Sequence, residues 1–246
     1  MTLNLMVNNM PVEAYCSDRD VKEIFIPLLK RLQRIAEEKQ GRALMMLAAP
    51  PAAGKSTLLK VLKIISEEMP DMPPVEIIGI DGYHRYNDYL KTHTMVRDGA
   101  EIPMVKVKGC PESFDLEKLT KNVQNVSSGA ICKWPDFDRM KEDPVEDAFT
   151  VASDIVILEG NYLLLESEGW KDLRKYADYT VSIRATPEFL RQRLIRRRVN
   201  AGVPCEQAVA FVDYSDMVNV RLCLEQTGAA DLELFLNSDG RYSVLP

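Results

Sequence analysis

Continuous apolar runs alternate with helical patterns along most of this chain of 246 residues. Apolar strands separated by helices indicate an α/β fold with a mainly parallel sheet and helices on both of its faces. The predicted strands cover 43–48, 75–80, 155–158 and 179–183, and the predicted helices cover 20–40, 55–69, 115–126, 162–176 and 186–200.

The two ends of the chain carry patterns of their own. Between Asp20 and Gln40 apolar residues recur with a helical period, and Pro27 marks either a kink or the real start of this helix. We therefore treat 1–40 as an N-terminal helical extension. Near the C-terminus, short apolar runs at 232–236 and 242–245 flank an Asn-Ser-Asp-Gly turn, which predicts a hairpin at one edge of the sheet.

Length, composition and charge narrow the class of protein. The length and the apolar content of 46% suit one large α/β domain. The formal charge is −6 and the sequence has no long lysine or arginine block, so it does not predict a basic surface for nucleic acid or an anionic membrane. We therefore expect a small-molecule partner. The five cysteines are widely spaced, which favours neither a disulfide framework nor a zinc site. No signal layout or long apolar run is present, so we expect a cytoplasmic protein and leave its oligomeric state open, a homodimer included.

Residues 49–56 lie between the first predicted strand and a helix, which is the context of a phosphate-binding P-loop. Backbone N–H groups at the helix start can hold phosphate oxygens, while Lys55 reaches the terminal phosphates and Ser56 offers its hydroxyl to Mg²⁺. Ala49 stands where the consensus has glycine, and any alanine of this loop at positive φ would cost roughly 1 kcal/mol or more. The alternative is an Ala/Pro-rich turn that contains Gly-Lys-Ser by chance. The expected nucleotide-binding residues are Pro51, Ala52, Ala53, Gly54, Lys55, Ser56 and Thr57.

Two carboxylates, Asp81 and Glu159, directly follow predicted strands. Ligands of open α/β sheets lie beyond the carboxyl ends of the strands, where a carboxylate can accept a hydroxyl proton or hold Mg²⁺. A solvated acid or a helix cap is the alternative for each. The segment 82–112 lacks periodicity and is long for a connection, so we interpret it as substrate-binding, with His84 as one contact, and we treat 130–150 as a second acceptor-side insertion.

Arginines crowd the predicted helix at 186–200. Phosphoryl transfer needs positive charge on the transferring group, preferably from a mobile segment, so we interpret 186–202 as a lid. Arg193 and Arg197 share a helix face and are expected to be catalytic, whereas a solvated basic face is the alternative. The full set is Arg191, Arg193, Arg196, Arg197 and Arg198.

Several short motifs follow the P-loop in a fixed order. They are Asp81-Gly82-Tyr83-His84, Lys108-Gly109-Cys110-Pro111-Glu112-Ser113-Phe114-Asp115, Pro135-Asp136-Phe137-Asp138-Arg139, Glu159-Gly160-Asn161-Tyr162 and the arginine-rich helix. This ordered set, over roughly residues 20–235, resembles the phosphoribulokinase, uridine kinase and bacterial pantothenate kinase family. The likeness is greatest to the fructokinase-like, largely uncharacterised branch of that family. One departure is Val107, where the family often has arginine.

The resemblance implies a P-loop NTPase fold with a helical lid and a kinase that uses ATP and Mg²⁺. It implies that Asp81 is the catalytic base and that Glu159 lies by the metal, together with Ser56. The acceptor-side residues that it implies are Tyr83, His84, Lys108, Glu112, Asp138, Arg139 and Asn161.

Together these features predict an ATP-dependent kinase whose acceptor is a hydroxyl of a small polar metabolite, a sugar or sugar-like compound. A nucleoside or pantothenate acceptor is the alternative within this class. An NTP hydrolase or nucleotide-dependent switch is the alternative from another class, and it would leave the acceptor-side motifs without a purpose. A dinucleotide-binding oxidoreductase would need a Gly-x-Gly-x-x-Gly spacing, which the sequence lacks.

Overall fold

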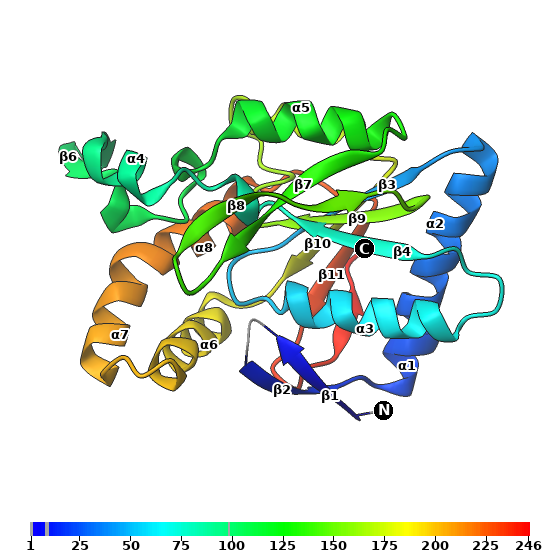
Figure 1. Cartoon of the computed structure of the whole chain (residues 1–246). Coiled ribbons are helices and arrows are strands. Elements are labelled where there is room, and N and C mark those ends of the chain that lie inside the picture. Colours follow the sequence, from blue (N-terminus) through cyan, green and yellow to red (C-terminus); the bar gives the residue numbers. More distant parts are fainter. Residues whose placement is uncertain (1, 8–9, 98) are drawn as a thin grey trace. The chain divides into compact units, whose positions relative to one another are not determined.

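The computed structural model describes residues 2–7, 10–97 and 99–246, and the chain folds into two compact units (Figure 1). The larger unit holds residues 1–78 and 153–246, and the smaller unit holds 79–152. The single kinase domain that we predicted stays a prediction. Both segments interpreted as acceptor-side insertions, 82–112 and 130–150, fall inside the smaller unit.

The larger unit is built on a six-stranded sheet with the order β12-β11-β10-β3-β9-β4. The pairs β3–β9, β3–β10 and β10–β11 are parallel, whereas β12 runs antiparallel to β11. The predicted mainly parallel sheet and its C-terminal edge hairpin are therefore confirmed. The strands are β3 (Ala43–Ala48), β4 (Val75–Gly79), β9 (Ile155–Gly160), β10 (Tyr179–Arg184), β11 (Leu232–Leu236) and β12 (Tyr242–Val244).

α-Helices, two π-helical segments and a 3-10 helix complete the larger unit. Those predicted over 55–69 and 186–200 are confirmed within two residues at each end. The α-helices are α1 (Asp18–Asp20), α2 (Ile26–Lys39), α3 (Lys55–Glu68), α6 (Pro187–Asn200), α7 (Cys205–Phe211) and α8 (Met217–Gln226). Two π-helical segments, η1 (Val21–Phe25) and η6 (Val212–Asp216), and one 3-10 helix, η5 (Trp170–Tyr176), join them. None of the helices in the described ranges is long and apolar enough to span a bilayer.

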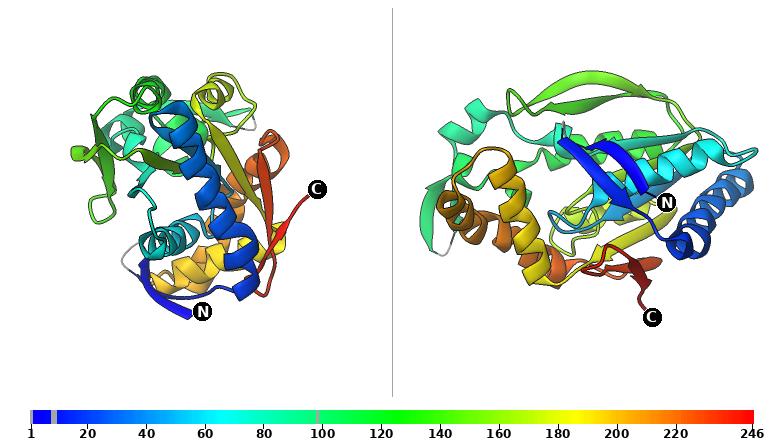
Figure 2. Two further views of the ribbon diagram at one scale, coloured as in Figure 1. Left: turned by 90° about the vertical axis from the view of Figure 1, so that its right-hand side faces the viewer. Right: turned by 90° about the horizontal axis from the view of Figure 1, so that it is seen from below.

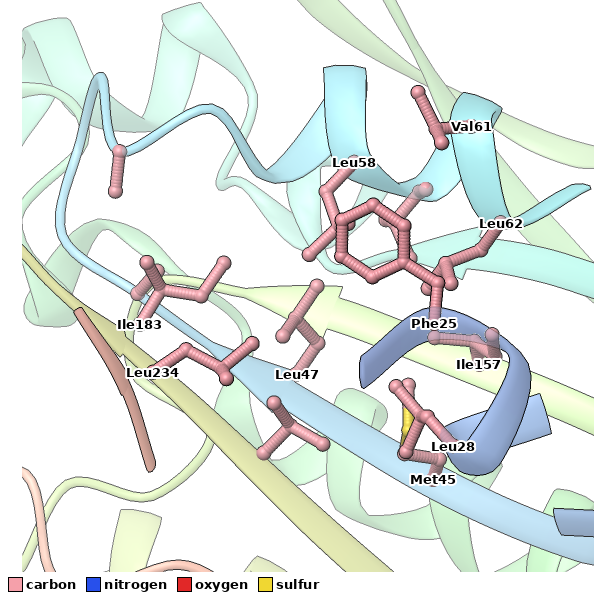
Figure 3. Close-up of a cluster of buried hydrophobic side chains, with 14 of the residues drawn as sticks. Phe25, Leu28, Met45, Leu47, Leu58, Val61, Leu62, Ile157, Ile183 and Leu234 are labelled. Atoms are coloured by element: carbon pink, nitrogen blue, oxygen red, sulfur yellow. The ribbon is translucent and has the colours of Figure 1, made fainter. Parts of the chain in front are cut away.

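One face of this sheet packs against α2 and α3 (Figure 3). Met45 and Leu47 point to the same face of β3, because alternate residues of a strand do so, and there they meet Leu28 of α2 and Leu58 of α3. All four side chains are at most 4% exposed. Burying a leucine fully stabilises a fold by roughly 1.5–3 kcal/mol, so this face holds β3 firmly at the point where the chain enters the P-loop.

The first residues form a β-hairpin and not the predicted helical extension. β1 (Thr2–Val7) pairs antiparallel with β2 (Met10–Tyr15), and β1 lies against α3 (Figure 2). Lys60 of α3 donates a hydrogen bond to the carbonyl of Met6. The hairpin was missed because its strands are short and the polar–apolar alternation of β1 covers only residues 2–5.

Pro27 lies inside a continuous helical segment and does not start it. The helix begins at Asp18, and the π-helical turn η1 ends two residues before Pro27. Proline has no N–H for the ordinary ladder, and a π-turn is one way in which a helix accommodates such an interruption.

The helix predicted over 162–176 is wrong for most of its length. Residues 161–169 form turns and bends, with an isolated β-bridge from Leu165 to Thr227, and the 3-10 helix η5 begins at Trp170. Residues 162–165 are all buried, so their apolar run reflects burial on every side and not the face of a helix. Gly169 has φ of +79°, a conformation that an α-helix does not accommodate.

The smaller unit contains a long antiparallel hairpin that the apolar pattern did not reveal. Strand β7 (Cys132–Asp138) pairs with β8 (Asp143–Val151), with a register shift between Trp134 and Asp136. The shift breaks the alternation that would mark a strand. The other elements are η2 (Asp81–Tyr83), α4 (Asn87–Thr92), β5 (Thr94–Arg97), β6 (Ala100–Pro103), η3 (Met104–Val107), η4 (Pro111–Ser113) and α5 (Leu116–Ser127).

Candidate active site

The P-loop leaves the carboxyl end of β3 and ends at the first turn of α3. Ala52 has φ of +64° and Gly54 has φ of +87°, both in the left-handed region. Ala49 and Ala53 are buried, and the Ala53 N–H donates to the Pro50 carbonyl at 3.2 Å. The first N–H groups of α3 have no partner within the helix and lie at the positive end of its dipole, which suits an anion.

Lys55 is the first residue of α3, and its ammonium group has two oxygen partners. Its Nζ donates to the Oδ1 of Asn161 at 2.5 Å and to the carbonyl of Ala49 at 3.1 Å. Asn161, which we predicted on the acceptor side, contacts the P-loop lysine, and its contact with an acceptor stays a prediction. The thiol of Cys223 lies 3.5 Å from the Asn161 carbonyl, and burial raises the pKa of this cysteine to about 12. No local pattern in the sequence marks Cys223 for this place.

Glu159 lies within β9, where it is paired with Leu47 of β3. We predicted that it follows the strand, but β9 continues to Gly160. Glu159 is half-buried, one residue before the strand ends and beside the strand that enters the P-loop.

Arg193 is the arginine of α6 that lies against Gly54 of the P-loop. A Cβ atom placed on Gly54 would be 3.5 Å from the Nη2 of Arg193. The guanidinium is half-buried, its centre lies 5.3 Å from the ring centroid of Phe189, and burial lowers its pKa. Within the described part of the chain no carboxylate pairs with it, so its charge is available to an anion at the loop.

The other arginines of α6 have different surroundings. Arg191 forms two hydrogen bonds to Asp213, at 2.6 and 2.8 Å, and Arg198 bonds Asp216 at 3.0 Å. These pairs tie α6 to η6. Arg197, predicted to act with Arg193, is exposed.

A pocket of about 640 Å³ lies in the larger unit. Thr186, Phe189, Asn237 and Tyr242 are among its lining residues, together with Leu236. Leu236 also approaches the P-loop, since its Cδ2 would lie 4.0 Å from a Cβ at position 54. This volume falls within the range of about 300–1,000 Å³ that is usual for the pockets of drug-sized ligands.

In the smaller unit, Asp81 begins η2 and forms an ion pair with Arg139. The Nη2 of Arg139 lies 3.1 Å from the Oδ2 of Asp81, and both side chains are partly exposed. Next to Asp81, a Cβ at Gly82 would come within 2.5 Å of the Pro135 carbonyl oxygen. Only glycine therefore permits this close approach, which fixes the Asp81 backbone against β7.

His84 and Tyr83 support this segment from inside the unit. The Nδ1 of His84 is 2.8 Å from the Asp81 carbonyl, its ring centroid is 4.0 Å from that of Phe114, and burial lowers its pKa. Tyr83 is 1% exposed, and its hydroxyl accepts a hydrogen bond from Asn122 at 2.8 Å. The side chain of Tyr83 belongs to the core of the smaller unit, and its contact with the acceptor stays a prediction.

Three further predicted acceptor residues lie elsewhere in the smaller unit. The Oδ1 of Asp138 accepts from the backbone N–H groups of Met140 and Lys141, which lowers the pKa of Asp138. Lys108 donates within the unit, to Asn87 and to the carbonyl of Glu142. Glu112 is exposed in η4.

The side-chain oxygens of Ser56 and Glu159 suit Mg²⁺ better than a metal ion whose ligands all come from protein side chains. No cluster of three or more His, Cys, Asp or Glu side chains that could hold a metal is found among the described residues. Mg²⁺ usually keeps waters and phosphate oxygens and needs one or two protein ligands. The Ser56 hydroxyl and the Glu159 carboxylate are donors of that kind.

Comparison with known proteins places the chain in a family. No family model matches it. It is 36% identical over 243 residues to the uncharacterized protein YggC of Escherichia coli K12, and the match covers 98% of each chain. The chain belongs to the YggC family.

The YggC family is a branch of the P-loop kinases, as predicted. The chain is 29% identical over 202 residues to C227.14 of Schizosaccharomyces pombe, a provisionally named uridine kinase, with 79% and 83% of the two chains covered. It is 28% identical over 198 residues to the pantothenate kinase of Shewanella putrefaciens, covering 70% of this chain and 60% of that one. A crystal structure of a provisionally named fructose transport system kinase from Silicibacter sp. TM1040 superposes with a TM-score of 0.72 and 28% identity, over 84% of this chain and 98% of the other.

Proposed function

We propose that this YggC-family protein is an ATP-dependent kinase that phosphorylates a hydroxyl of a sugar or sugar-like metabolite. The observation that carries the proposal is the half-buried Arg193 guanidinium, which lies against Gly54 without a carboxylate partner in the described residues. Lys55 begins the helix that follows Gly54. Among the described residues, its ammonium group donates only to two neutral oxygens, those of Ala49 and Asn161. Two cations at one anion-binding loop suit a polyphosphate.

On the nucleotide side, residues 51–57 hold the phosphates through the backbone N–H groups that follow Pro51, and Lys55 and Arg193 neutralise the phosphate charge. Arg197 joins them when the lid, 186–202, closes. Ser56 and Glu159 hold Mg²⁺, and the pocket beside Leu236 takes the nucleoside. ATP supplies an activated phosphoryl group, with Mg²⁺ offsetting its charge.

On the acceptor side, Asp81 accepts the proton of the acceptor hydroxyl and Arg139 orients the acceptor. Because the transition state of phosphoryl transfer is loose, positioning and electrostatic stabilisation contribute more than proton removal. A cytoplasmic place of action and a role in carbohydrate metabolism are part of this proposal.

The test is ADP release from Mg-ATP across a panel of sugars, sugar acids, nucleosides and pantothenate, with the phosphorylated product identified by mass spectrometry. The proposal expects turnover of the wild type with a sugar-like acceptor and almost no turnover of the Lys55→Ala variant. Equal ADP release with and without every acceptor would replace the kinase with the NTP hydrolase or nucleotide-dependent switch.

A nucleoside or pantothenate acceptor is the second candidate, favoured by the likeness to the relatives from S. pombe and S. putrefaciens. The same panel separates the two, because the acceptor with the highest kcat/KM decides between them.

A further inference from the structure

We propose that Asn87 and Lys108 are positioning residues, which clamp the turn at 138–142 so that Arg139 stays on Asp81. Neither residue is assigned this part by the resemblance, which implies that Lys108 contacts the acceptor. The effect of the clamp on turnover rests on the proposed function, whereas the hydrogen bonds that form the clamp do not.

The clamp is a set of hydrogen bonds from α4 and Lys108 to the far end of the turn. The Oδ1 of Asn87 accepts from the Nζ of Lys108 at 2.7 Å, and its Nδ2 donates to the Glu142 carbonyl at 3.0 Å. Lys108 also donates to the Glu142 carbonyl. The backbone N–H of Asn87 donates to the Oδ1 of Asp143 at 2.7 Å. Residues distant in sequence thus converge on the end of one short turn.

The near end of the turn is fixed by its own side chain. Asp138 accepts from the N–H groups of Met140 and Lys141 at 2.9 and 3.1 Å. Glu142 has φ of +54°, an uncommon conformation for a residue other than glycine. Such a conformation persists where the surroundings hold it, and here Asn87 and Lys108 bond its carbonyl.

The donors of Lys108 leave little capacity for an acceptor. An ammonium group has three donors. Two are directed at Asn87 and Glu142, and the ring centroid of Phe137 lies 5.1 Å from the Nζ. The described contacts of Lys108 therefore match a role in holding the turn.

Arg139 depends on the turn because its contact with Asp81 is a single hydrogen bond of 3.1 Å. A long and half-exposed side chain keeps one such contact only if its backbone is fixed. Loosening the end of the turn at Glu142 should let Arg139 leave Asp81.

Limited trypsin digestion tests the clamp without any assumption about the reaction. Trypsin cleaves after Arg139 and Lys141, whose side chains are 44% and 78% exposed. Asn87→Ala and Lys108→Met should raise the cleavage rate at these two sites about tenfold or more, relative to sites in the larger unit. The matched control is Lys106→Met, an exposed lysine two residues away, which should leave the rate unchanged.

Unchanged cleavage at both sites in the Asn87 and Lys108 variants would overturn the clamp. A variant that unfolds as a whole is recognised because sites in the larger unit accelerate equally. If one of the two variants unfolds in this way, the other variant decides the test. If tryptic cleavage accelerates equally at every site in both variants, the clamp is also overturned.

A double-mutant cycle tests whether the clamp acts through Arg139. Asn87→Ala should lower kcat/KM for the acceptor about tenfold, with the KM for ATP unchanged. The Asn87→Ala/Arg139→Ala double variant should be no worse than Arg139→Ala within about twofold, because a lost contact cannot be lost twice. Multiplying effects would overturn the positioning role. Absence of acceptor-dependent turnover in the wild type would overturn the proposed function instead, and the trypsin result would stand.

Discussion

Lys55 of the P-loop donates a hydrogen bond of 2.5 Å to Asn161, the residue that follows the neighbouring strand β9. Its second partner, the Ala49 carbonyl, is also neutral. In the described part of the chain no carboxylate neutralises this ammonium group. The adjacent strand end therefore orients the cation without cancelling the charge that phosphates need.

We expect Lys55→Ala to abolish nearly all phosphoryl transfer while leaving the thermal midpoint unchanged.

Asn161→Ala should raise the KM for ATP several-fold and leave the KM for the acceptor unchanged, because Asn161 acts on the lysine. Lys30→Ala, which removes an exposed lysine of α2, is the control. A selective change in the acceptor KM would return Asn161 to the acceptor side.

Ala52→Gly should stabilise the protein. Ala52 has φ of +64°, which costs an alanine roughly 1 kcal/mol and glycine almost nothing. The greater freedom of glycine in the unfolded chain offsets part of this gain, so we expect the free energy of unfolding to rise by about 0.5 kcal/mol. Ala49→Gly is the matched control: Ala49 is buried without positive φ, and its replacement should destabilise. Urea unfolding of both variants measures the difference, and equal signs would contradict the strain argument.

The sequence predicted those parts of the fold that local patterns determine. Strands such as β3 are continuous apolar runs because both faces of the sheet are covered, so they stand out against the helices. The hairpin of β7 and β8 was missed because the register shift at Pro135 removes the regular alternation. Asn87 was missed for another reason: its partners, Lys108 and Glu142, lie 21 and 55 residues away. A pattern read along the chain carries no record of such contacts.

The arginine-rich helix shows the same limit. Helical spacing places Arg193 and Arg197 on one face, but only the packing of α6 shows that Arg193 is the one against Gly54. Arg193→Gln should therefore raise the KM for ATP or lower kcat by about tenfold or more, since a charge-assisted hydrogen bond contributes roughly 1.5–3 kcal/mol. Arg196→Gln changes an exposed arginine on the same helix and should have little effect. Equal effects from both variants, measured by steady-state kinetics, would mean that the helix contributes only a general positive field.

Asp81→Asn should keep ATP binding and lower kcat by about 10²–10⁴, the usual contribution of a positioned general base. The control is Asp88→Asn, in the same unit, whose carboxylate is 99% exposed. ATP affinity is measured by calorimetry and kcat with the best acceptor of the panel. Loss of ATP affinity with a normal rate per bound complex would make Asp81 a structural or metal residue.

The chain has two histidines, and they make a matched pair for a test of stability against pH. Burial lowers the pKa of His84 from its ordinary value of 6.5, so the folded protein holds this ring neutral at a pH where the unfolded chain takes up a proton. The unfolded state then binds more protons below about pH 6.5, and stability falls as the pH decreases.

Between pH 7.5 and 5.5 the contribution of His84 to this loss is at most roughly 1.4 kcal/mol, the value for a ring that never protonates in the folded state. His84→Gln should remove that part of the pH dependence, whereas His93→Gln, which changes an exposed ring, should keep the wild-type slope. Trp134 reports on the smaller unit when Trp170, the other tryptophan, is replaced by Phe. Urea unfolding followed by its fluorescence at the two pH values gives the slope. If the His84 variant loses as much stability on acidification as the His93 variant, protonation of His84 is not what weakens the segment that carries Asp81.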